Sequence, residues 1–353
     1  MKTRSSLPSE TRLPALDGFR AVAIAMVLIC HFCSAPNMSS TANMIIQRMG
    51  FGVEVFFVVS GFLITHLLLN EIRTFGSISL RLFYIRRFLR IAPPLIFFLL
   101  ALAFLSLLRV IATPHWDLLY CTLFIRNFFG TSPQTAHCWS LSVEEHFYLV
   151  WPFLLVLLRT HRLRLLFCLA VILATPFWST FIYQLAGGAN HANSFRTDLR
   201  LSGLAIGSAL ACVRFIPSGL ELFQSRWMND RITVSLAFFV VVLSLFSNVF
   251  SLRIIRAFAP LISSAGVMLL INAAISYPEI WWVRILEARP IVLIGKMSYS
   301  IYLWQQLCMP SIDDENVSIE ERFIRLCLAI LVAWLMFGLI EKPLLRYRSR
   351  FRR

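Results

Sequence analysis

Apolar runs long enough to cross a lipid bilayer recur along the whole sequence, separated by short polar segments. A transmembrane helix needs about 20 mostly apolar residues, and ten runs meet or approach that length. They cover residues 14–33, 50–70, 91–112, 138–158, 164–185, 198–214, 232–250, 256–276, 290–310 and 321–341. The pattern predicts an all-α polytopic membrane protein with about ten transmembrane helices. The polar and aromatic segment 114–137 is expected to lie at the membrane interface.

Composition supports this interpretation. Of the 353 residues, 58% are hydrophobic and only 14% are charged, so a soluble fold would expose large apolar surfaces to water. The apolar runs continue from end to end, and we therefore expect residues 1–353 to form one integral-membrane domain. Arg20 interrupts the first run and no small-residue cleavage site follows it promptly, which favours a retained helix over a signal peptide.

The formal net charge of +15 is explained by membrane topology rather than by nucleic-acid binding, which we reject. Most of the basic residues lie in the polar segments on one side of the predicted bundle. The positive-inside rule assigns that side to the cytoplasm, so both termini are expected to be cytoplasmic. The acidic loop Asp313-Asp314-Glu315 then falls outside.

The first apolar run carries two polar residues on one helical face. Arg20 and His31 are eleven residues apart, which is three helical turns plus about 20°, and about 16 Å along the axis. A charged side chain facing lipid costs at least about 2.5 kcal/mol, so this face is expected to line a polar chamber. The alternative for Arg20 alone is that its long side chain snorkels to the interface.

Polar residues of other predicted spans lie at the depth of the same chamber. Glu54 is about 6 Å and Glu144 about 9 Å below the outer boundary, given a rise of 1.5 Å per residue. Arg200 is at the outer start of its span, and Tyr302 lies in the outer part of the ninth. Glu145 is expected to point toward a neighbouring helix. Ionisable residues inside a membrane are functional candidates by default.

An arginine-rich segment, residues 81–94, precedes the third span on the cytoplasmic side. Arg87 and Arg90 are i,i+3 neighbours on one helical face, a spacing that suits a phosphate held between two guanidinium groups. The alternative is a positive-inside anchor on anionic lipid.

The eight cysteines are scattered, mostly within apolar runs, and are expected to behave as small buried hydrophobic side chains. Cys30, His31 and Cys33 resemble a metal cluster only superficially, because a fourth ligand at suitable spacing is missing. We expect no metal site.

Taken together, the motifs are similar to those of the acyltransferase-3 family, whose integral-membrane O-acyltransferases modify bacterial surface polysaccharides and some small molecules. The matching segments, in family order, are LDGFRAVAIAMVLICHF, GVEVFFVVSGFLI, FYIRRFLRIAP, WSLSVEEHFYLVWP, RLSGLAIGSALA, SYSIYLWQ and IEKPLLR. The chain stops soon after Glu341 and so resembles members without a fused extracytoplasmic domain. Gln305 departs from the pattern, because relatives often carry His there.

The resemblance implies a protein of the bacterial inner membrane that uses acyl-CoA, expected to be acetyl-CoA, from the cytoplasmic side, with no permanently bound cofactor. The acceptor would be a hydroxyl of a saccharide, glycolipid or other molecule on the far side or within the membrane. Carried over by motif position, His31 is the general base, Arg20 a pore and donor-site residue, and Arg87 and Arg90 contact the CoA phosphates. The other polar chamber residues would be Glu54, Glu144 and Arg200.

The chemistry agrees with these roles. An imidazole has a pKa near working pH and can take the proton of an attacking hydroxyl. A carboxylate usually orients such a ring, and Glu54 and Glu144 both remain open for that role. The oxyanion needs a hydrogen-bond donor, for which Ser60, Tyr302 and backbone amides are candidates. No Gly-x-Ser-x-Gly elbow is present, which disfavours a covalent serine mechanism.

Two other classes of function are compatible with part of this pattern. A transporter or flippase of lipid-linked sugars would explain the spans and the polar chamber equally well, but paired helix interruptions in two halves are not visible. A sensor or scaffold would leave the shared face of Arg20 and His31 unexplained. Acceptor identity, acyl chain length and oligomeric state stay open.

Overall fold

The computed structural model describes residues 13–34, 39–185, 195–225, 230–245, 253–310 and 317–351. Within these ranges the regular structure is entirely helical, without strands, which confirms the predicted all-α class. The acidic loop Asp313-Asp314-Glu315, the link around Ser251 and both chain termini lie outside the described residues, so the predicted position of the termini stays a prediction.

Each of the ten predicted spans coincides with a helix. These are α1 (Pro14–Cys33), α3 (Gly52–Phe75), α4 (Leu80–Leu107), α6 (Cys138–Leu157), α7 (His161–Leu185), α8 (Thr197–Arg214), α11 (Arg231–Leu245), α12 (Arg253–Ser276), α14 (Arg289–Cys308) and α15 (Ile319–Met336). The chain between and after them forms α2 (Ser40–Arg48), η1 (Met49–Phe51), α5 (His115–Thr122), η2 (Pro133–Thr135), α9 (Pro217–Gln224), α13 (Trp281–Leu286), the π-helix η5 (Phe337–Glu341), α16 (Lys342–Arg348) and η6 (Ser349–Phe351).

Judged by length and mean hydropathy alone, fewer than ten of these helices could cross a membrane. In the described part of the chain there are seven, or eight if α8 and α9, which meet at a bend of 106°, form one span. Helix α11 is short, with 15 residues. Helix α14 carries polar residues that the bundle buries, among them Ser298, Ser300, Gln305 and Gln306, and a helix shielded from lipid can carry such residues. The number of crossings therefore stays a prediction.

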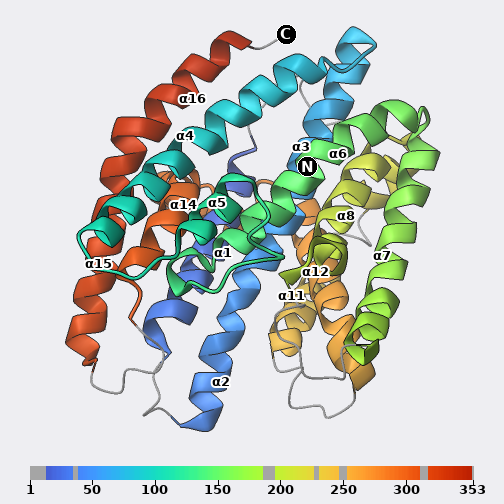
Figure 1. Ribbon diagram of the computed structural model, residues 1–353. Coiled ribbons are helices and arrows are strands. Elements are labelled where there is room, and N and C mark those ends of the chain that lie inside the picture. Colours follow the sequence, from blue (N-terminus) through green and yellow to red (C-terminus); the bar gives the residue numbers. More distant parts are fainter. Residues whose placement is uncertain are drawn as a thin grey trace.

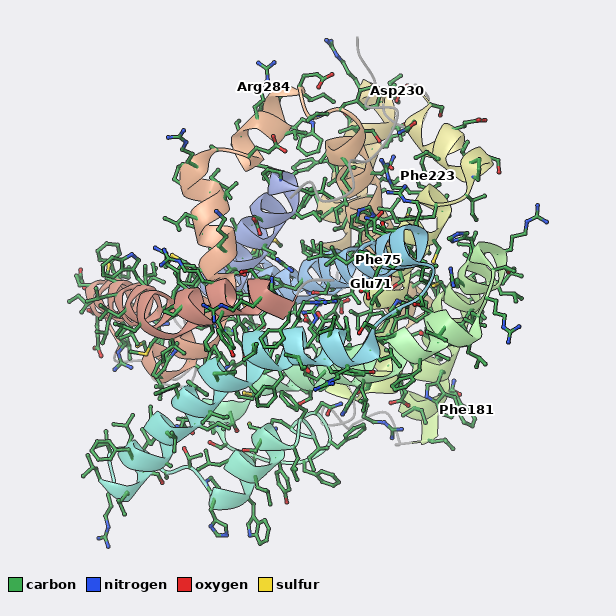
Figure 2. The ribbon with its side chains drawn as sticks, turned by 90° about the horizontal axis from the view of Figure 1, so that it is seen from above. Glu71, Phe75, Phe181, Phe223, Asp230 and Arg284 are labelled. Atoms are coloured by element: carbon green, nitrogen blue, oxygen red, sulfur yellow. The ribbon has the colours of Figure 1, made fainter. Side chains whose placement is uncertain are left out.

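Large apolar side chains cover the outside of the bundle. Leu107 of α4, Phe177 of α7, Phe238 of α11 and Phe323 of α15 are all more than half exposed. Figure 2, seen from above, shows side chains extending from the rim of the bundle on all sides. Exposed apolar surface on this scale is suited to contact with lipid, and it agrees with the multi-pass membrane protein that the sequence predicts.

The helices that carry the candidate site lie in the middle of the bundle, with α15 and α16 on one flank and α7 on the other (Figure 1). Close packing of α3 against α8 depends on glycine: a Cβ added to Gly61 would collide with the carbonyl of Leu204, and one added to Gly207 would collide with the carbonyl of Val58. Small residues allow two membrane helices to approach this closely. The approach aligns α3 and α8 in parallel, because Glu54 lies beside Arg200 and Gly61 beside Ser208.

Helices α1 and α14 are also parallel and in close contact. A Cβ on Gly295 would collide with the carbonyl of Asp17 near the start of α1, and His31 near its end contacts Gln305. Parallel pairing of the first with the ninth predicted span, and of the second with the sixth, is in line with the predicted alternation of directions across a bilayer. These two helix pairs bring together the residues of the candidate site.

Candidate active site

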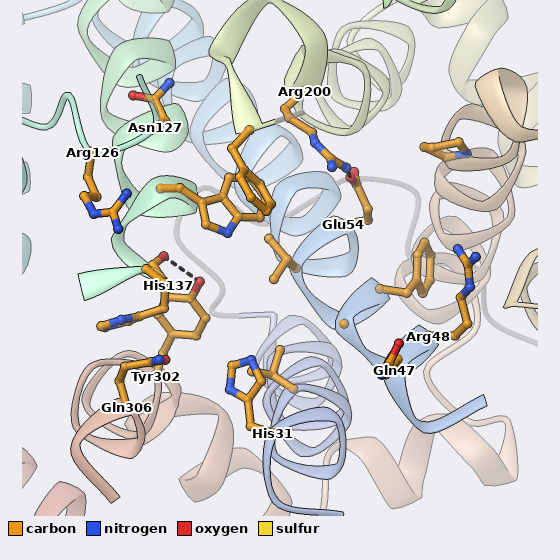
Figure 3. Close-up of a pocket in the computed structure, with 18 of the residues that line it drawn as sticks. His31, Gln47, Arg48, Glu54, Arg126, Asn127, His137, Arg200, Tyr302 and Gln306 are labelled. Carbon is orange, nitrogen blue, oxygen red and sulfur yellow. Dashed lines mark hydrogen bonds and ion pairs between the residues drawn. The ribbon is translucent and has the colours of Figure 1, made fainter. Parts of the chain in front are cut away.

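A cavity of about 700 Å³ lies between the central helices. Its walls come from α1, α2, η1, α3, α6, α8, α12 and α14, together with the connection that follows α5. Four of the predicted site residues line it: His31, Glu54, Arg200 and Tyr302. Figure 3 shows Glu54 and Arg200 side by side, with His31 and Tyr302 on other sides of the cavity. We refer to this space as the outer cavity.

His31 sits in the last turn of α1 and reaches the outer cavity. Its Nδ1 atom lies 2.9 Å from Oε1 of Gln305, a fully buried residue of α14. With the amide oxygen of Gln305 facing the ring, Nδ1 would carry the proton and Nε2 would keep its lone pair. A general base requires this tautomer.

The orienting group is therefore an amide and not one of the two carboxylates that sequence reasoning offered for it. Helix α14 packs against α1 in parallel and places Gln305 beside the ring, whereas both carboxylates have other partners. Glu54 accepts a hydrogen bond from Arg200 at 3.1 Å, and Glu144 accepts one from Tyr148 at 2.6 Å.

Glu54 and Arg200 form a partly buried ion pair at the wall of the outer cavity. The Glu54 side chain is 9% exposed and that of Arg200 26%. The guanidinium group also lies over the rings of Trp139, 5.4 Å from its centroid, and Phe195, 5.9 Å from its centroid. The ring contacts and the ion pair together hold Arg200 in place, and its positive charge compensates the negative charge of Glu54.

A second, smaller pocket of about 80 Å³ contains the other predicted residues. Arg20, Arg87, Arg90, Ser60 and Glu144 line it, and we call it the arginine pocket. Arg20 and His31 share a face of α1 as predicted, but their separation along the axis places them in different cavities. Arg20 lies 3.7 Å from Asp17 one turn earlier.

Arg87 and Arg90 meet in this pocket as their i,i+3 spacing predicts. The Arg87 guanidinium lies 4.0 Å from the centroid of the Tyr148 ring. Arg90 makes no hydrogen bond or ion pair to any residue that the structure describes. Their neighbour Arg86 is different, because it bonds to Glu71 at 3.3 Å and to the carbonyl of Phe351 and does not line the pocket.

Glu144 is the one carboxylate among the residues that line the arginine pocket. Its Oε2 atom accepts hydrogen bonds from Tyr148 at 2.6 Å and from Ser60 at 3.4 Å. Ser60 thus has a local role in holding this carboxylate. Among the lining residues three guanidinium groups face one carboxylate, and Asp17 beside Arg20 offsets part of their charge. Guanidinium groups that line a pocket suit an anionic ligand.

Tyr302 and Val53 line both cavities. The Tyr302 hydroxyl donates to the carbonyl of His137 at 2.9 Å and lies 2.6 Å from Oγ of Ser140; the first of these bonds is drawn in Figure 3. The polar chamber expected from the sequence is thus seen as two cavities with two lining residues in common. Tyr302 stands between the arginine pocket and His31.

Several residues of the site were missed by sequence reasoning. Tyr148 is one helical turn after Glu144, a spacing at which side chains meet, so this contact could have been anticipated. The role of Gln305 could not, because it depends on how α14 is rotated against α1. Arg48, Arg126 and Trp139 also line the outer cavity. Among the described residues, no three His, Cys, Asp or Glu side chains gather closely enough to hold a metal ion.

Comparisons with known proteins identify the family of the chain. The profile of a family described as "Acyltransferase domain" matches residues 13–340. The chain is 28% identical to peptidoglycan O-acetyltransferase OatA of Listeria monocytogenes over 97% of this chain and 57% of that protein. It is also 28% identical to O-acetyltransferase OatA of Staphylococcus aureus, over 97% of this chain and 59% of that protein. The chain thus spans less than two thirds of these relatives. No solved structure matches it significantly.

Proposed function

The chain belongs to the family of acyltransferase domains, and from that membership we propose that it is an O-acyltransferase of the bacterial inner membrane. It would move an acyl group from acyl-CoA on the cytoplasmic side to a hydroxyl of a cell-envelope saccharide or glycolipid. We take the group to be acetyl, because relatives over nearly the whole of this chain are named as O-acetyltransferases. The observation that carries the proposal is the arrangement along α1, with Arg20 in the arginine pocket and His31 in the outer cavity.

The arginine pocket is proposed as the donor side. CoA carries phosphates, and Arg87 and Arg90 are spaced to hold one phosphate between two guanidinium groups. Arg90 has no described partner to displace, and Arg87 is oriented by the ring of Tyr148. The pocket volume of about 80 Å³ is too small for a whole CoA, so we propose that the nucleotide stays on the cytoplasmic side with a phosphate held by Arg87 and Arg90, while the acyl-pantetheine end extends past these two residues.

The outer cavity is proposed as the acceptor side. A volume of about 700 Å³ falls within the range of pockets that enclose a small molecule, and its walls combine polar groups with aromatic rings. The acceptor hydroxyl would lie against Nε2 of His31. To reach it, the acyl group has to pass Val53 and Tyr302, so we propose that the Tyr302 side chain moves during the reaction.

The reaction then follows from the groups present. Nε2 of His31 takes the proton of the acceptor hydroxyl as its oxygen attacks the thioester carbonyl carbon. The new C–O bond forms, the C–S bond breaks, and CoA leaves as the thiolate, which takes up the proton that His31 accepted. Gln305 keeps the imidazole in the correct tautomer throughout. No covalent acyl-enzyme is required.

Mass spectrometry of envelope glycans from cells with and without the gene tests this proposal. Loss of an ester-linked acyl mass in the deletion strain, restored by the wild-type gene, is the expected result. A transporter or flippase of lipid-linked sugars would change the amount of a glycan while leaving its acylation unaltered. That outcome would replace the enzyme by the transporter.

A further inference from the structure

The charges around the outer cavity are unbalanced. Three arginines line it, Arg48, Arg126 and Arg200, and the only carboxylate among the described lining residues is Glu54. Figure 3 shows the three guanidinium groups on separate sides of the cavity, with His31 at its lower edge in that view.

Two of the three arginines are already engaged. Arg200 is paired with Glu54 at 3.1 Å. Arg126 donates to Oγ1 of Thr135 and to the carbonyls of Phe129 and Ser132, and it lies 3.9 Å from the buried carboxylate of Asp117. These two side chains stabilise the walls of the cavity, and neighbouring carboxylates compensate their charges.

Arg48 is the exception. It is the last residue of α2, half-buried at the cavity wall, and it makes no hydrogen bond or ion pair with any residue that the structure describes. Arg48 also lies near the end of α1 that carries His31. The preceding residue, Gln47, accepts a hydrogen bond from Cys30 at 3.4 Å through its carbonyl, and Cys30 directly precedes His31.

A partly buried arginine without a partner, facing a cavity, is suited to bind an anion. A neutral sugar would leave this guanidinium group without a charge-assisted hydrogen bond after water has been displaced from it, and that loss disfavours binding. The aromatic wall formed by Trp139 and Phe195, whose ring centroids are 4.7 Å apart, offers the apolar contact that the face of a sugar ring needs.

We propose that the acceptor is an acidic saccharide, which carries a carboxylate or phosphate bound by Arg48 while its reactive hydroxyl lies at His31. The inference rests on the proposed function and narrows its substrate class. Arg48 acts here as a specificity residue of the acceptor side and has no part in binding acyl-CoA, because it lines the outer cavity and not the arginine pocket.

The first test identifies the charge of the product. The full-length protein in phosphatidylcholine nanodiscs, which contain no anionic lipid, is incubated with radiolabelled acetyl-CoA and envelope glycans from a strain that lacks the gene. The glycans are then separated on an anion exchanger. We expect alkali-labile label in the retained, acidic fraction. Alkali-labile label only in the unretained fraction would overturn the inference and leave the proposed function intact, whereas no alkali-labile label at all would overturn both.

The second test uses matched variants on the same acidic and neutral glycan fractions. Arg48→Gln is expected to raise the KM for the acidic fraction about tenfold or more, the effect of losing one charge-assisted hydrogen bond, with the KM for acetyl-CoA unchanged. Arg48→Lys keeps the charge and should recover part of the loss. Arg325→Gln is the control, because Arg325 pairs with Glu321 on α15 and does not line the cavity. Equal effects of Arg48→Gln and Arg325→Gln would refute the assignment.

Discussion

Nδ1 of His31 lies 2.9 Å from Oε1 of Gln305, so the ring that faces the outer cavity is oriented by a neutral amide. An amide can select the tautomer, but it brings no negative charge to stabilise the imidazolium that forms when the base is protonated. The orienting role of Gln305 can therefore be separated from the basicity of His31 by substitution.

Gln305→Ala is expected to lower kcat by up to about 10²-fold, because a misplaced general base loses its alignment with the acceptor hydroxyl. The KM for acyl-CoA should stay near the wild-type value, since Gln305 does not line the arginine pocket. Gln305→His retains a side chain that can hydrogen-bond Nδ1 and should recover much of the activity. Full activity in Gln305→Ala, measured as kcat at saturating acyl-CoA, would show that the contact has no function.

The arginine pair should govern the donor. Arg87→Lys and Arg90→Lys keep the charge but lose the bidentate geometry of the guanidinium group, so the KM for acyl-CoA should rise while the KM for the acceptor stays nearly constant. Arg86→Lys is the matched control, because the adjacent Arg86 is engaged with Glu71 outside the pocket. Unaltered affinity for acyl-CoA in Arg87→Ala/Arg90→Ala would leave lipid anchoring as the role of this segment.

Tyr148 joins Arg87 to Glu144, and two substitutions divide its contacts. Tyr148→Phe keeps the ring beneath the Arg87 guanidinium but removes the hydrogen bond of 2.6 Å to Glu144, so kcat should fall several-fold with little change in the KM for acyl-CoA. Tyr148→Leu removes both contacts and should also raise that KM. A purely structural role predicts instead the same loss of thermal stability in both variants without a split between kcat and KM.

The packing of α3 on α8 has its own test. Gly61→Ala places a methyl group against the carbonyl of Leu204, which would force apart the helices that carry Glu54 and Arg200, and the thermal midpoint in detergent should fall by several degrees. Gly338→Ala is the control, because nothing lies within 4 Å of the added Cβ. Equal midpoints of the two variants would argue against the close approach of α3 and α8.

Much of this arrangement was accessible from the sequence. The length of a bilayer crossing fixes the size of an apolar run, so all ten predicted spans coincide with helices. Helical periodicity likewise places Arg87 and Arg90 together, because residues three apart share a face irrespective of what surrounds them. Both inferences depend only on local geometry.

The side chain that contacts His31 could not be predicted in the same way, and it is Gln305 rather than Glu54 or Glu144. The two carboxylates were predicted at similar depths, but depth along an axis does not say which neighbour a side chain faces. The contacts of Gly61 and Gly207 set how α3 is rotated against α8, with Glu54 of α3 at the outer cavity, whereas Glu144 of α6 lines the arginine pocket. Helix α14 does not meet the hydropathy criterion for a span, because it carries polar residues. Other helices rather than lipid surround these residues.

The most direct test of the account is acyl transfer by His31→Ala. Wild-type and variant proteins, purified and reconstituted into sealed vesicles, are supplied with radiolabelled acetyl-CoA on the side of the arginine pocket and with envelope glycan on the other. Loss of a general base should lower the rate of ester formation by about 10²-fold or more, while the thermal midpoint and the affinity for acetyl-CoA remain those of the wild type. A His31→Ala rate above about a tenth of the wild-type rate would contradict the assignment of His31 as the base.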